Sequence, residues 1–335
     1  MKLVTYLKEG HEQLGVLING IVYDMDVLHP DLPGSMNMFL NYWEDMFPFA
    51  QAGELMLREG TRSSNKGVPL GELELLSPVP FPNSLRKGFA FRNHAEALWR
   101  SKGAELPSAF DQFPVFSFSN HHSTQGPGNI FCMPDHFEKL DFGLEAAVVI
   151  SKHGKNISAA EADDYIGGLM IMNGMSARRL QEEEMQLSNS SAKGNDFCTA
   201  FGPWLVTPDE LENLEIPAKE NHMGKCWNLP MKVHVNGELI SEANLGDMDW
   251  TFAEIIERAS YGVDLYPGDV IGSGPAGKGC FLELNGTSKL SSPEYSEQWL
   301  QNGDVADIEI DGLGKLSNTI AAEETEYSIL AKKKF

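Results

Sequence analysis

Short apolar segments separated by turn residues recur along the whole chain, and they predict a fold rich in β-strands. Leu14–Ile18 and Ile21–Tyr23 form a predicted hairpin, because Asn19-Gly20 supplies the positive φ angles that a two-residue turn requires. A second hairpin is predicted over residues 304–320, around the turn residues Asp311-Gly312. Because these signals lie near opposite ends of the chain, we expect β-structure throughout.

Helical signals are fewer. Residues 36–60 carry apolar side chains at helical spacing. Capping boxes predict one helix from Ser158 to about Met172 and another from Thr251 to about Ser260. The run Leu144–Ile150 predicts a strand that is buried on both faces, and Phe281–Leu284 predicts another strand. The expected class is therefore α+β with a β-rich core, not a doubly wound parallel sheet.

The length of 335 residues suits one large domain or two modest ones. A proline-rich boundary follows the short apolar segment that begins at Glu72. We therefore predict a small N-terminal α+β domain over residues 1–72 and a main domain over residues 73–335.

The charge balance disfavours several classes of partner. The chain has 26 Lys and Arg against 48 Asp and Glu, a formal net charge of −22. Such a field repels phosphate backbones and anionic membrane surfaces. The opening MKLVTYLKEG lacks an apolar signal core, and no run of about 18 apolar residues occurs. We expect a cytoplasmic protein that binds neither nucleic acid nor membranes.

Cysteine spacing points to the same compartment. The four cysteines form no C-x-x-C pair, which disfavours a zinc ribbon or a redox dithiol; they are Cys132, Cys198, Cys226 and Cys280. Scattered cysteines in a chain of this length are typical of reduced, mostly buried thiols.

Several polar residues could carry chemistry, although each also has a structural explanation. His94 follows an aromatic segment, but one histidine of nine is more often structural than catalytic. His121-His122 lies among loop residues and is a weak metal signal, since adjacent residues do not share a face. Asp141-Phe-Gly-Leu-Glu145 precedes the apolar strand, and Lys193 opens a segment rich in glycine and aromatic residues. No G-x-S-x-G or H-E-x-x-H motif occurs, which argues against an ordinary α/β-hydrolase and a zincin.

Taken in order, these segments resemble the fumarylacetoacetate hydrolase family over nearly the whole chain. Eight pieces carry the resemblance: MKLVTY at the start, R-N-H-A at 92–95, G-P-G-N-I at 126–130, D-F-G-L-E-A-A-V-V-I at 141–150, N-G-M-S-A-R-R-L-Q at 173–181, K-G-N-D-F at 193–197 with G-P-W at 202–204, L-x-P-G-D-V-I at 265–271, and L-E-L at 282–284. The resemblance implies a mixed β-roll or β-sandwich catalytic domain, usually in a homodimer. It also implies C–C bond hydrolysis in 1,3-dicarbonyl compounds, or decarboxylation, isomerisation or hydration of related keto acids.

The resemblance also assigns roles to residues. It implies that His94 and Glu283 form a pair that activates water, and that Lys193 stabilises the developing carbanion. Gln181 matches a residue that contacts substrate, and Arg178 is a candidate for binding the substrate's carboxylate. These residue types are all present.

The positions that hold a divalent cation in the family are different here. The resemblance implies Mg²⁺, Mn²⁺ or Ca²⁺ bound by four carboxylates. In this chain Lys87, Gly143 and Gly174 replace three of them, and Glu145 alone remains. The threonine that the resemblance implies after Ser273-Gly274 is also missing, and Pro275 stands in its place. One carboxylate does not satisfy a hard cation, which prefers about six oxygen ligands. We therefore expect no metal and no other cofactor, with Lys87 and Glu145 in a substrate-binding role.

Three hypotheses about function follow. The first is a metal-independent enzyme that acts on a small acidic dicarbonyl or keto-acid substrate through an enolate, with C–C bond hydrolysis as the leading reaction and decarboxylation, tautomerisation or cyclisation as alternatives. The second is a metal-dependent hydrolase whose ligands come from Asp141, Asp196 or the His121-His122 loop. The third is a non-catalytic binding or scaffold relative. An ion pair between Lys87 and Glu145 would favour the first hypothesis over the second.

Overall fold

Two β-sheets organise the chain in the computed structural model, which describes residues 1–187 and 192–332. The larger sheet has the order β4-β3-β2-β1-β15-β13-β11-β21-β6-β7, with β5 beside β1 and β8 beside β15. Its strands are β1 (Lys2–Lys8), β2 (His11–Ile18), β3 (Ile21–Asp24), β4 (Val68–Pro69), β5 (Glu74–Leu75), β6 (Ser84–Gly88), β7 (Phe116–Ser119), β8 (Thr124–Gln125), β11 (Leu144–Ile150), β13 (Ile166–Gly174), β15 (Thr199–Val206) and β21 (Asp269–Gly272).

The smaller sheet has the order β19-β18-β22-β23-β9. Its strands are β9 (Gly128–Cys132), β18 (Pro230–Val235), β19 (Glu238–Asn244), β22 (Val305–Ile310) and β23 (Gly314–Ala322). Three two-stranded ribbons complete the β-structure: β10 (Leu140–Asp141) with β14 (Ser176–Ala177), β12 (Gly154–Lys155) with β20 (Asp264–Leu265), and β16 (Glu215–Ile216) with β17 (Cys226–Trp227). The fold is α+β and strand-rich, as predicted.

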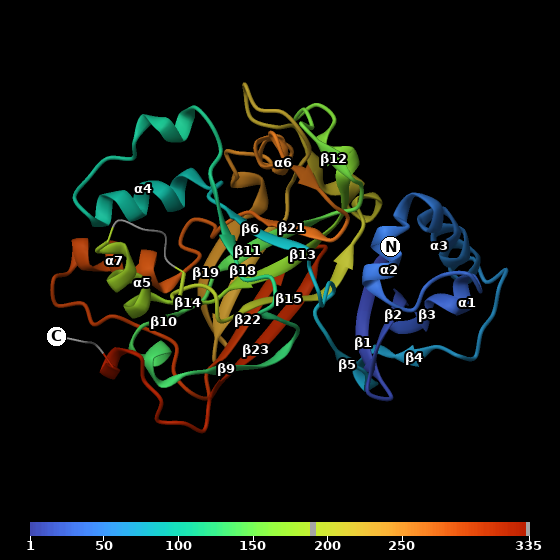
Figure 1. Cartoon of the computed structure of the whole chain (residues 1–335), viewed down its shortest axis with the longest axis horizontal. Helices are drawn as coiled ribbons and strands as arrows, with labels where there is room; N and C mark the ends of the chain where they lie inside the picture. The colour runs from blue at the N-terminus through green and yellow to red at the C-terminus, as the bar shows by residue number, and fades with distance from the viewer. Residues whose placement is uncertain (188–191, 333–335) are drawn as a thin grey trace.

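Helices cover two ends of this core (Figure 1). The helices α1 (Met25–Leu28), α2 (Met36–Asn41) and α3 (Trp43–Arg58) belong to the N-terminal part, at the right of that view. At the other end lie α4 (Arg92–Ser101), α5 (Arg178–Met185) and α7 (Phe281–Ser291), and α6 (Phe252–Ser260) lies at the top. Helices α4 and α7 pack against each other. In the described residues, no helix combines the length and the apolar character needed to cross a membrane.

Both predicted hairpins are confirmed. Strands β2 and β3 pair antiparallel, and Asn19 and Gly20 between them adopt positive φ angles of 50° and 81°. Strands β22 and β23 pair antiparallel at the other end of the chain. The capping box at Thr251 also forms, and it begins α6.

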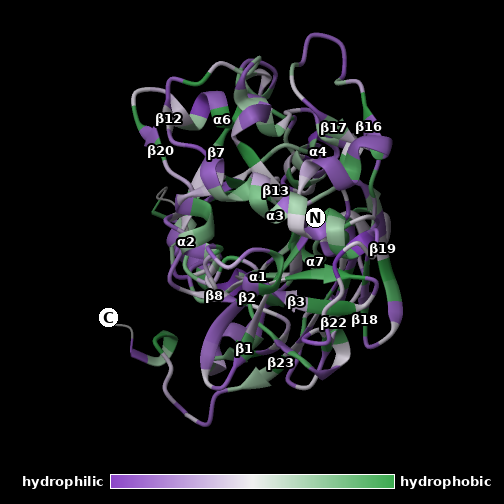
Figure 2. Cartoon of the chain, turned by 90° about the vertical axis from the view of Figure 1, so that its right-hand side faces the viewer, coloured by the Kyte–Doolittle hydropathy of each residue, from purple (hydrophilic) through white to green (hydrophobic). Residues whose placement is uncertain are grey.

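The central strands β11 and β13 are buried on both faces, which explains their nearly continuous apolar sequence. Side chains alternate along β11: Val148 belongs to the core shared with the smaller sheet, whereas Val149 belongs to the core beneath the N-terminal helices. Figure 2 shows hydrophobic residues along inner strands such as β22 and β23, and hydrophilic residues on the projecting loops.

One predicted helix is wrong. The segment that follows Ser158 forms only a 3₁₀ turn at Ala162–Tyr165 and then becomes strand β13. Ser158 does bind Glu161, but side chain to side chain, at 2.7 Å. Pairing of Ile166–Gly174 with both β11 and β15 outweighs the local capping signal, since it buries every residue of the segment.

The larger sheet crosses the predicted domain boundary at residues 72 and 73. Strand β1 pairs with β15 of the main part, where Lys2 lies opposite Val206 and Leu3 opposite Leu205. The division into residues 1–72 and 73–335 stays a prediction, and so do the homodimer and the cytoplasmic location.

Candidate active site

Two buried side chains from neighbouring helices form the centre of the candidate site. His94 lies in α4 and Glu283 lies in the first turn of α7, and each side chain is about 5% exposed or less. His94 Nδ1 lies 2.6 Å from Glu283 Oε2. The backbone amide of Lys278 donates to Glu283 Oε1 at 2.7 Å. When Glu283 accepts a hydrogen bond from Nδ1, His94 keeps Nε2 free to accept a proton.

The position of Glu283 depends on Asp141. The Asp141 side chain is completely buried, and its carboxylate accepts hydrogen bonds from the first two amides of α7, those of Phe281 at 2.7 Å and Leu282 at 3.1 Å. A carboxylate at a helix N-terminus satisfies amides that have no partner within the helix. The prediction of a strand at Phe281–Leu284 is therefore wrong, because this distant carboxylate begins a helix there.

Asp141 also binds Arg178, which in turn binds Gln181; both are candidates for contacting substrate. Arg178 Nε donates to Asp141 Oδ2 at 2.8 Å, and Arg178 Nη1 donates to Gln181 Oε1 at 2.9 Å. Both Arg178 and Gln181 lie on α5, which the short ribbon of β10 and β14 places beside Asp141. The structure therefore brings Arg178, Gln181 and the start of α7 together around one carboxylate.

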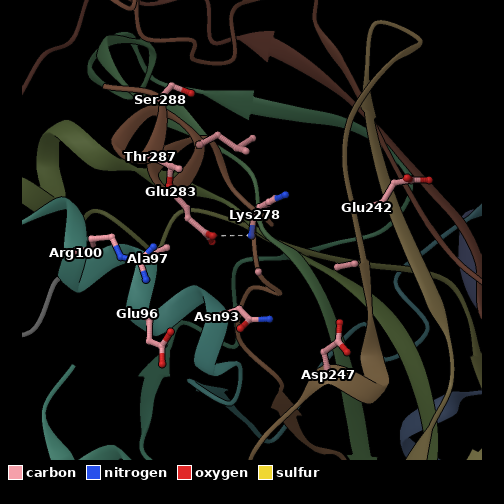
Figure 3. A pocket seen from close by; sticks show the side chains of 13 residues that line it. Asn93, Glu96, Ala97, Arg100, Glu242, Asp247, Lys278, Glu283, Thr287 and Ser288 are labelled. Atoms are coloured by element: carbon pink, nitrogen blue, oxygen red, sulfur yellow. Dashed lines mark hydrogen bonds between the residues drawn. The ribbon is translucent and has the colours of Figure 1, made fainter. Parts of the chain in front are cut away.

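A groove between α4 and α7 opens beside Glu283 (Figure 3), with a volume of about 450 Å³. In Figure 3, Asn93, Glu96 and Arg100 project from α4, while Glu283, Thr287 and Ser288 project from α7. A Cβ placed on Gly286 would lie only 2.9 Å from the Ser101 Cβ, so a glycine is needed where the helices approach most closely. The groove combines acidic side chains with Arg100 and Lys278, so its charge is mixed.

Lys87 and Glu145 lie on one face of the larger sheet. In the sheet, β21 lies between β6 and β11: Gly272 pairs with both Lys87 and Ala147, two residues beyond Glu145. Side chains two residues apart share a face, so Glu145 and Ala147 point to the same side. Lys87 is half-buried, and loss of solvent around its ammonium lowers its pKa, although Glu145 acts in the opposite direction.

The Glu145 carboxylate fills space that only glycines at positions 143 and 174 provide. A Cβ on either Gly143 or Gly174 would overlap Glu145 Oε1, and a Cβ on Gly174 would also lie 3.4 Å from Lys87 Nζ. Glu145 is 2% exposed, and its Oε2 has no hydrogen-bond partner among the described residues. Burial raises the pKa of Glu145 to about 7, against the opposing charges of Lys87 and Arg178.

These residues do not fit the divalent cation that the family uses. Of the four positions, only Glu145 offers an oxygen ligand, and an ammonium group lies beside it. The alternative ligands do not join it. Asp141 is occupied by Arg178 and helix amides, and Asp196 bonds Lys193. The rings of His121 and His122 contact each other at a tilt of 41°. The described contacts include no ion pair between Lys87 and Glu145, so the contact that would have favoured the metal-independent hypothesis over the metal-dependent one is not found, although a Cβ on Gly174 would lie near both groups.

Lys193 is not brought to the histidine and glutamate. Its side chain is 58% exposed, and its ammonium bonds Asp196 at 2.9 Å. It borders a separate cavity of about 260 Å³ with His136 and Phe197. Its predicted role in stabilising a carbanion therefore stays a prediction that this geometry does not support.

Sequence reasoning missed one neighbour of the pair. The ligand atoms of Cys280, His94 and Glu283 all lie within 4.8 Å of one another. Burial raises the pKa of the Cys280 thiol, which keeps it protonated and unsuited to nucleophilic attack. Only its position three residues before Glu283 could have drawn attention to it.

Comparison with known proteins agrees with this architecture. Residues 85–321 match the family model described as the C-terminal domain of fumarylacetoacetate hydrolase. The oxaloacetate tautomerase Fahd2a of Rattus norvegicus, a mitochondrial protein, is 28% identical over 329 residues, which cover 96% of this chain and 91% of the relative. The oxaloacetate tautomerase YisK of Bacillus subtilis is 32% identical over 258 residues, which cover 75% of this chain and 74% of the relative.

Solved structures show the same fold. A fumarylacetoacetate hydrolase from the psychrophile Exiguobacterium antarcticum superposes with a TM-score of 0.70 at 22% identity, covering 96% of this chain and all of that one. A maleylpyruvate hydrolase from Sphingobium, solved with manganese and pyruvate, superposes with a TM-score of 0.68 at 20% identity, covering 97% of this chain and all of that one. The fold, together with the pairing of His94 and Glu283, is that of the enzymes related to fumarylacetoacetate hydrolase. The chain belongs to the fumarylacetoacetate hydrolase family.

Proposed function

We propose that this protein interconverts the keto and enol forms of a small β-keto acid without a divalent cation. The observation that carries the proposal is the retained pair of His94 and Glu283 in a chain whose cation positions hold a half-buried lysine and two glycines instead of three carboxylates. Two relatives that cover most of this chain are named as oxaloacetate tautomerases, which favours a substrate with a ketone between or beside carboxylates.

His94 is the base in this proposal. Its Nε2 removes a proton from the carbon next to the ketone, and Glu283 stabilises the imidazolium that forms. The carbon's electron pair forms a C=C bond while the carbonyl oxygen becomes negative. Lys87 stabilises that oxygen with a charge-assisted hydrogen bond, in the place where other family members use a cation. Arg178 and Gln181 are candidates for holding a substrate carboxylate.

The test is an ultraviolet assay of oxaloacetate ketonisation, since the enol absorbs more strongly than the ketone. Protein treated with EDTA and shown by elemental analysis to be free of metal is expected to keep its full activity. Full recovery only after adding Mg²⁺ or Mn²⁺ would contradict metal independence. If oxaloacetate and related keto acids all react at the uncatalysed rate, the enzymatic proposal itself fails and a binding or scaffold role becomes the better explanation.

Hydrolysis of a C–C bond is a second candidate, because a base held by Glu283 can also activate water. Product analysis by mass spectrometry distinguishes the two. A tautomerase returns the mass of its substrate, whereas a hydrolase produces two smaller acids.

A further inference from the structure

Cys280 lies immediately before α7 and has no part in the proposed reaction. Its side chain is completely buried, and those of His94 and Glu283 are only 4% exposed. The sulfur of Cys280, a ring nitrogen of His94 and a carboxylate oxygen of Glu283 all lie within 4.8 Å of one another. Three different ligand atoms therefore share one small, buried volume.

Two packed helices hold these atoms in place. Cys280 and Glu283 are three residues apart at the beginning of α7, so their side chains lie on the same side of the helix. His94 comes from α4, which packs against α7. The start of α7 is itself fixed by Asp141, whose carboxylate accepts a hydrogen bond from the amide of Phe281 at 2.7 Å. The cluster is thus built on rigid elements and not on a loop.

The ligand atoms specify the class of ion. A thiolate and an imidazole favour Zn²⁺ and other borderline-soft cations, whereas Mg²⁺ and Ca²⁺ prefer oxygen ligands alone. Zinc sites with an open position have three protein ligands, which is the number present here. Since zinc bonds are about 2.0–2.3 Å long, tetrahedral ligand atoms lie roughly 3.3–3.6 Å apart, and side-chain shifts of about 1 Å would close this cluster around an ion.

The surroundings of Cys280 allow its thiol to become a ligand. Burial and the charge of Asp141 raise the pKa of the thiol, so it is protonated in the free protein. Arg178 and the backbone amide of Glu283 act in the opposite direction and favour the thiolate. A zinc ion displaces the thiol proton, which passes to solvent, and the sulfur's electron pair forms the bond to the metal. Nothing is oxidised or reduced in this exchange.

The ion also has a route to the cluster. Glu283 borders the groove of about 450 Å³ between α4 and α7, and Figure 3 shows its carboxylate directed toward Lys278 at that groove. Water from the groove can therefore supply the fourth ligand that a tetrahedral zinc requires.

We propose that His94, Cys280 and Glu283 bind Zn²⁺ and that the bound ion inhibits the enzyme. The metal site stands on its own geometry, whereas the inhibition rests on the proposed function, in which His94 Nε2 accepts a proton. Zinc bound to Nε2 occupies the lone pair that the reaction needs. Zinc bound to Nδ1 leaves the remaining ring proton on Nε2. The base is lost in either arrangement, so the ion is an inhibitor and not a cofactor.

Cobalt binding tests the site without turnover, because Co²⁺ replaces Zn²⁺ in such sites and a thiolate ligand gives it a charge-transfer band in the near ultraviolet. Metal-free wild-type protein is expected to show this band with one Co²⁺ per chain, and Zn²⁺ is expected to abolish it by competition. Cys280→Ser and Cys280→Ala are each expected to lose the band and, by calorimetry, to bind Zn²⁺ at least tenfold more weakly. His94→Ala should weaken zinc binding to a similar extent.

The matched control is Cys226→Ser, which changes a half-buried cysteine on β17 and should keep both the band and the zinc affinity. Circular dichroism and thermal melting confirm that each variant is folded before it is measured, and two substitutions of Cys280 guard against the failure of one.

Inhibition is measured in the ultraviolet assay, with the rate of each protein expressed relative to its own rate without zinc. Zn²⁺ is expected to inhibit the wild type, and EDTA is expected to reverse the inhibition. The zinc concentration that halves the rate is expected to rise at least tenfold in Cys280→Ser and to stay unchanged in Cys226→Ser.

The metal site is overturned if Co²⁺ gives no thiolate band in the wild type, or if the folded Cys280 variants bind Zn²⁺ as tightly as the wild type, since the ion would then be held at the surface only. The inhibitory role is overturned if zinc bound at this site leaves enol conversion unchanged. Failure of the proposed function looks different, because the wild type would then convert no keto acid with or without zinc. The cobalt band and its loss in Cys280→Ser would still decide the metal site.

Discussion

Glu145 occupies the volume that a side chain on Gly174 would need, and Lys87 Nζ lies 3.4 Å from the Cβ position of such a side chain. The glycine and the glutamate are thus mutually dependent, although they come from different strands, β13 and β11. A larger residue at position 174 would therefore force the Glu145 carboxylate to move.

Gly174→Ala is therefore expected to displace Glu145 and to reduce tautomerase activity. Because the site is buried, we expect a loss of about 1–3 kcal/mol in the free energy of unfolding, as for other overpacked positions. Urea denaturation and the ultraviolet assay measure the two effects. Gly71→Ala is the matched control, since nothing lies within 4 Å of a Cβ there, and it should change both quantities little. If the alanine is equally costly when Glu145 is also replaced by Ala, the collision is not with the carboxylate.

The pair of His94 and Glu283 is expected to dominate catalysis. His94→Ala should lower kcat by about 10²–10⁴-fold, the usual contribution of a positioned general base. Glu283→Gln should have a smaller effect, because an amide still hydrogen-bonds the ring but stabilises the imidazolium less. Steady-state kinetics with melting curves check both, and His234→Ala, on β18 of the smaller sheet, is the control. A His94→Ala protein with wild-type kcat would remove His94 from the mechanism.

The raised pKa of Glu145 predicts a dependence of stability on pH. The native carboxyl, with a pKa of about 7, holds its proton at pH values where the unfolded chain, near 4.5, has released it. Its contribution to stability is thus fully present below pH 4.5 and is lost as the pH rises to about 7. Lys87 and Arg178 are the charged groups that act on it.

Urea denaturation from pH 4.5 to 7.5 measures this effect, and comparison with Glu145→Gln isolates it, since glutamine does not titrate. The difference in the free energy of unfolding between wild type and variant is expected to shift against the wild type as the pH rises. A difference that stays constant over this range would mean that Glu145 titrates normally.

Asp141→Asn is expected to be among the most destabilising single changes at the site. It removes the counterion of buried Arg178 and weakens the cap on α7. Breaking a buried pair typically costs about 3–5 kcal/mol. Glu182→Gln, which breaks an exposed pair with Lys139, should cost no more than about 1 kcal/mol. Chemical denaturation of both variants gives the comparison, and similar costs would show that Arg178 does not depend on Asp141.

Local patterns in the sequence predicted the strands well where turn residues bounded them, as at Asn19-Gly20 and in the late hairpin. The failures have long-range causes. Phe281–Leu284 is a short, mostly apolar segment that was predicted to be a strand, but its first two amides are bound by Asp141, which lies 140 residues before Phe281. The capping signal at Ser158 predicted a helix up to about Met172, but the segment from Ile166 forms a strand that pairs with two neighbouring strands, β11 and β15.

The candidate site shows the same division. The pairing of His94 with Glu283 and the loss of cation ligands could be predicted from residue types, because the resemblance supplied their positions. The position of the Glu145 carboxylate against Gly143 and Gly174 could not be predicted, because it depends on the register of β11 against β13.

Asp141 has a consequence for sorting relatives of this chain. Asp141 is the first acidic residue of the segment Asp141-Phe-Gly-Leu-Glu145, and its residue type alone would suggest a metal ligand. Here its two oxygens are already shared among a guanidinium and helix amides, so it acts as a strut that fixes one helix against another. This structural role requires no metal ion, so an aspartate at this position is not by itself evidence for a metal site.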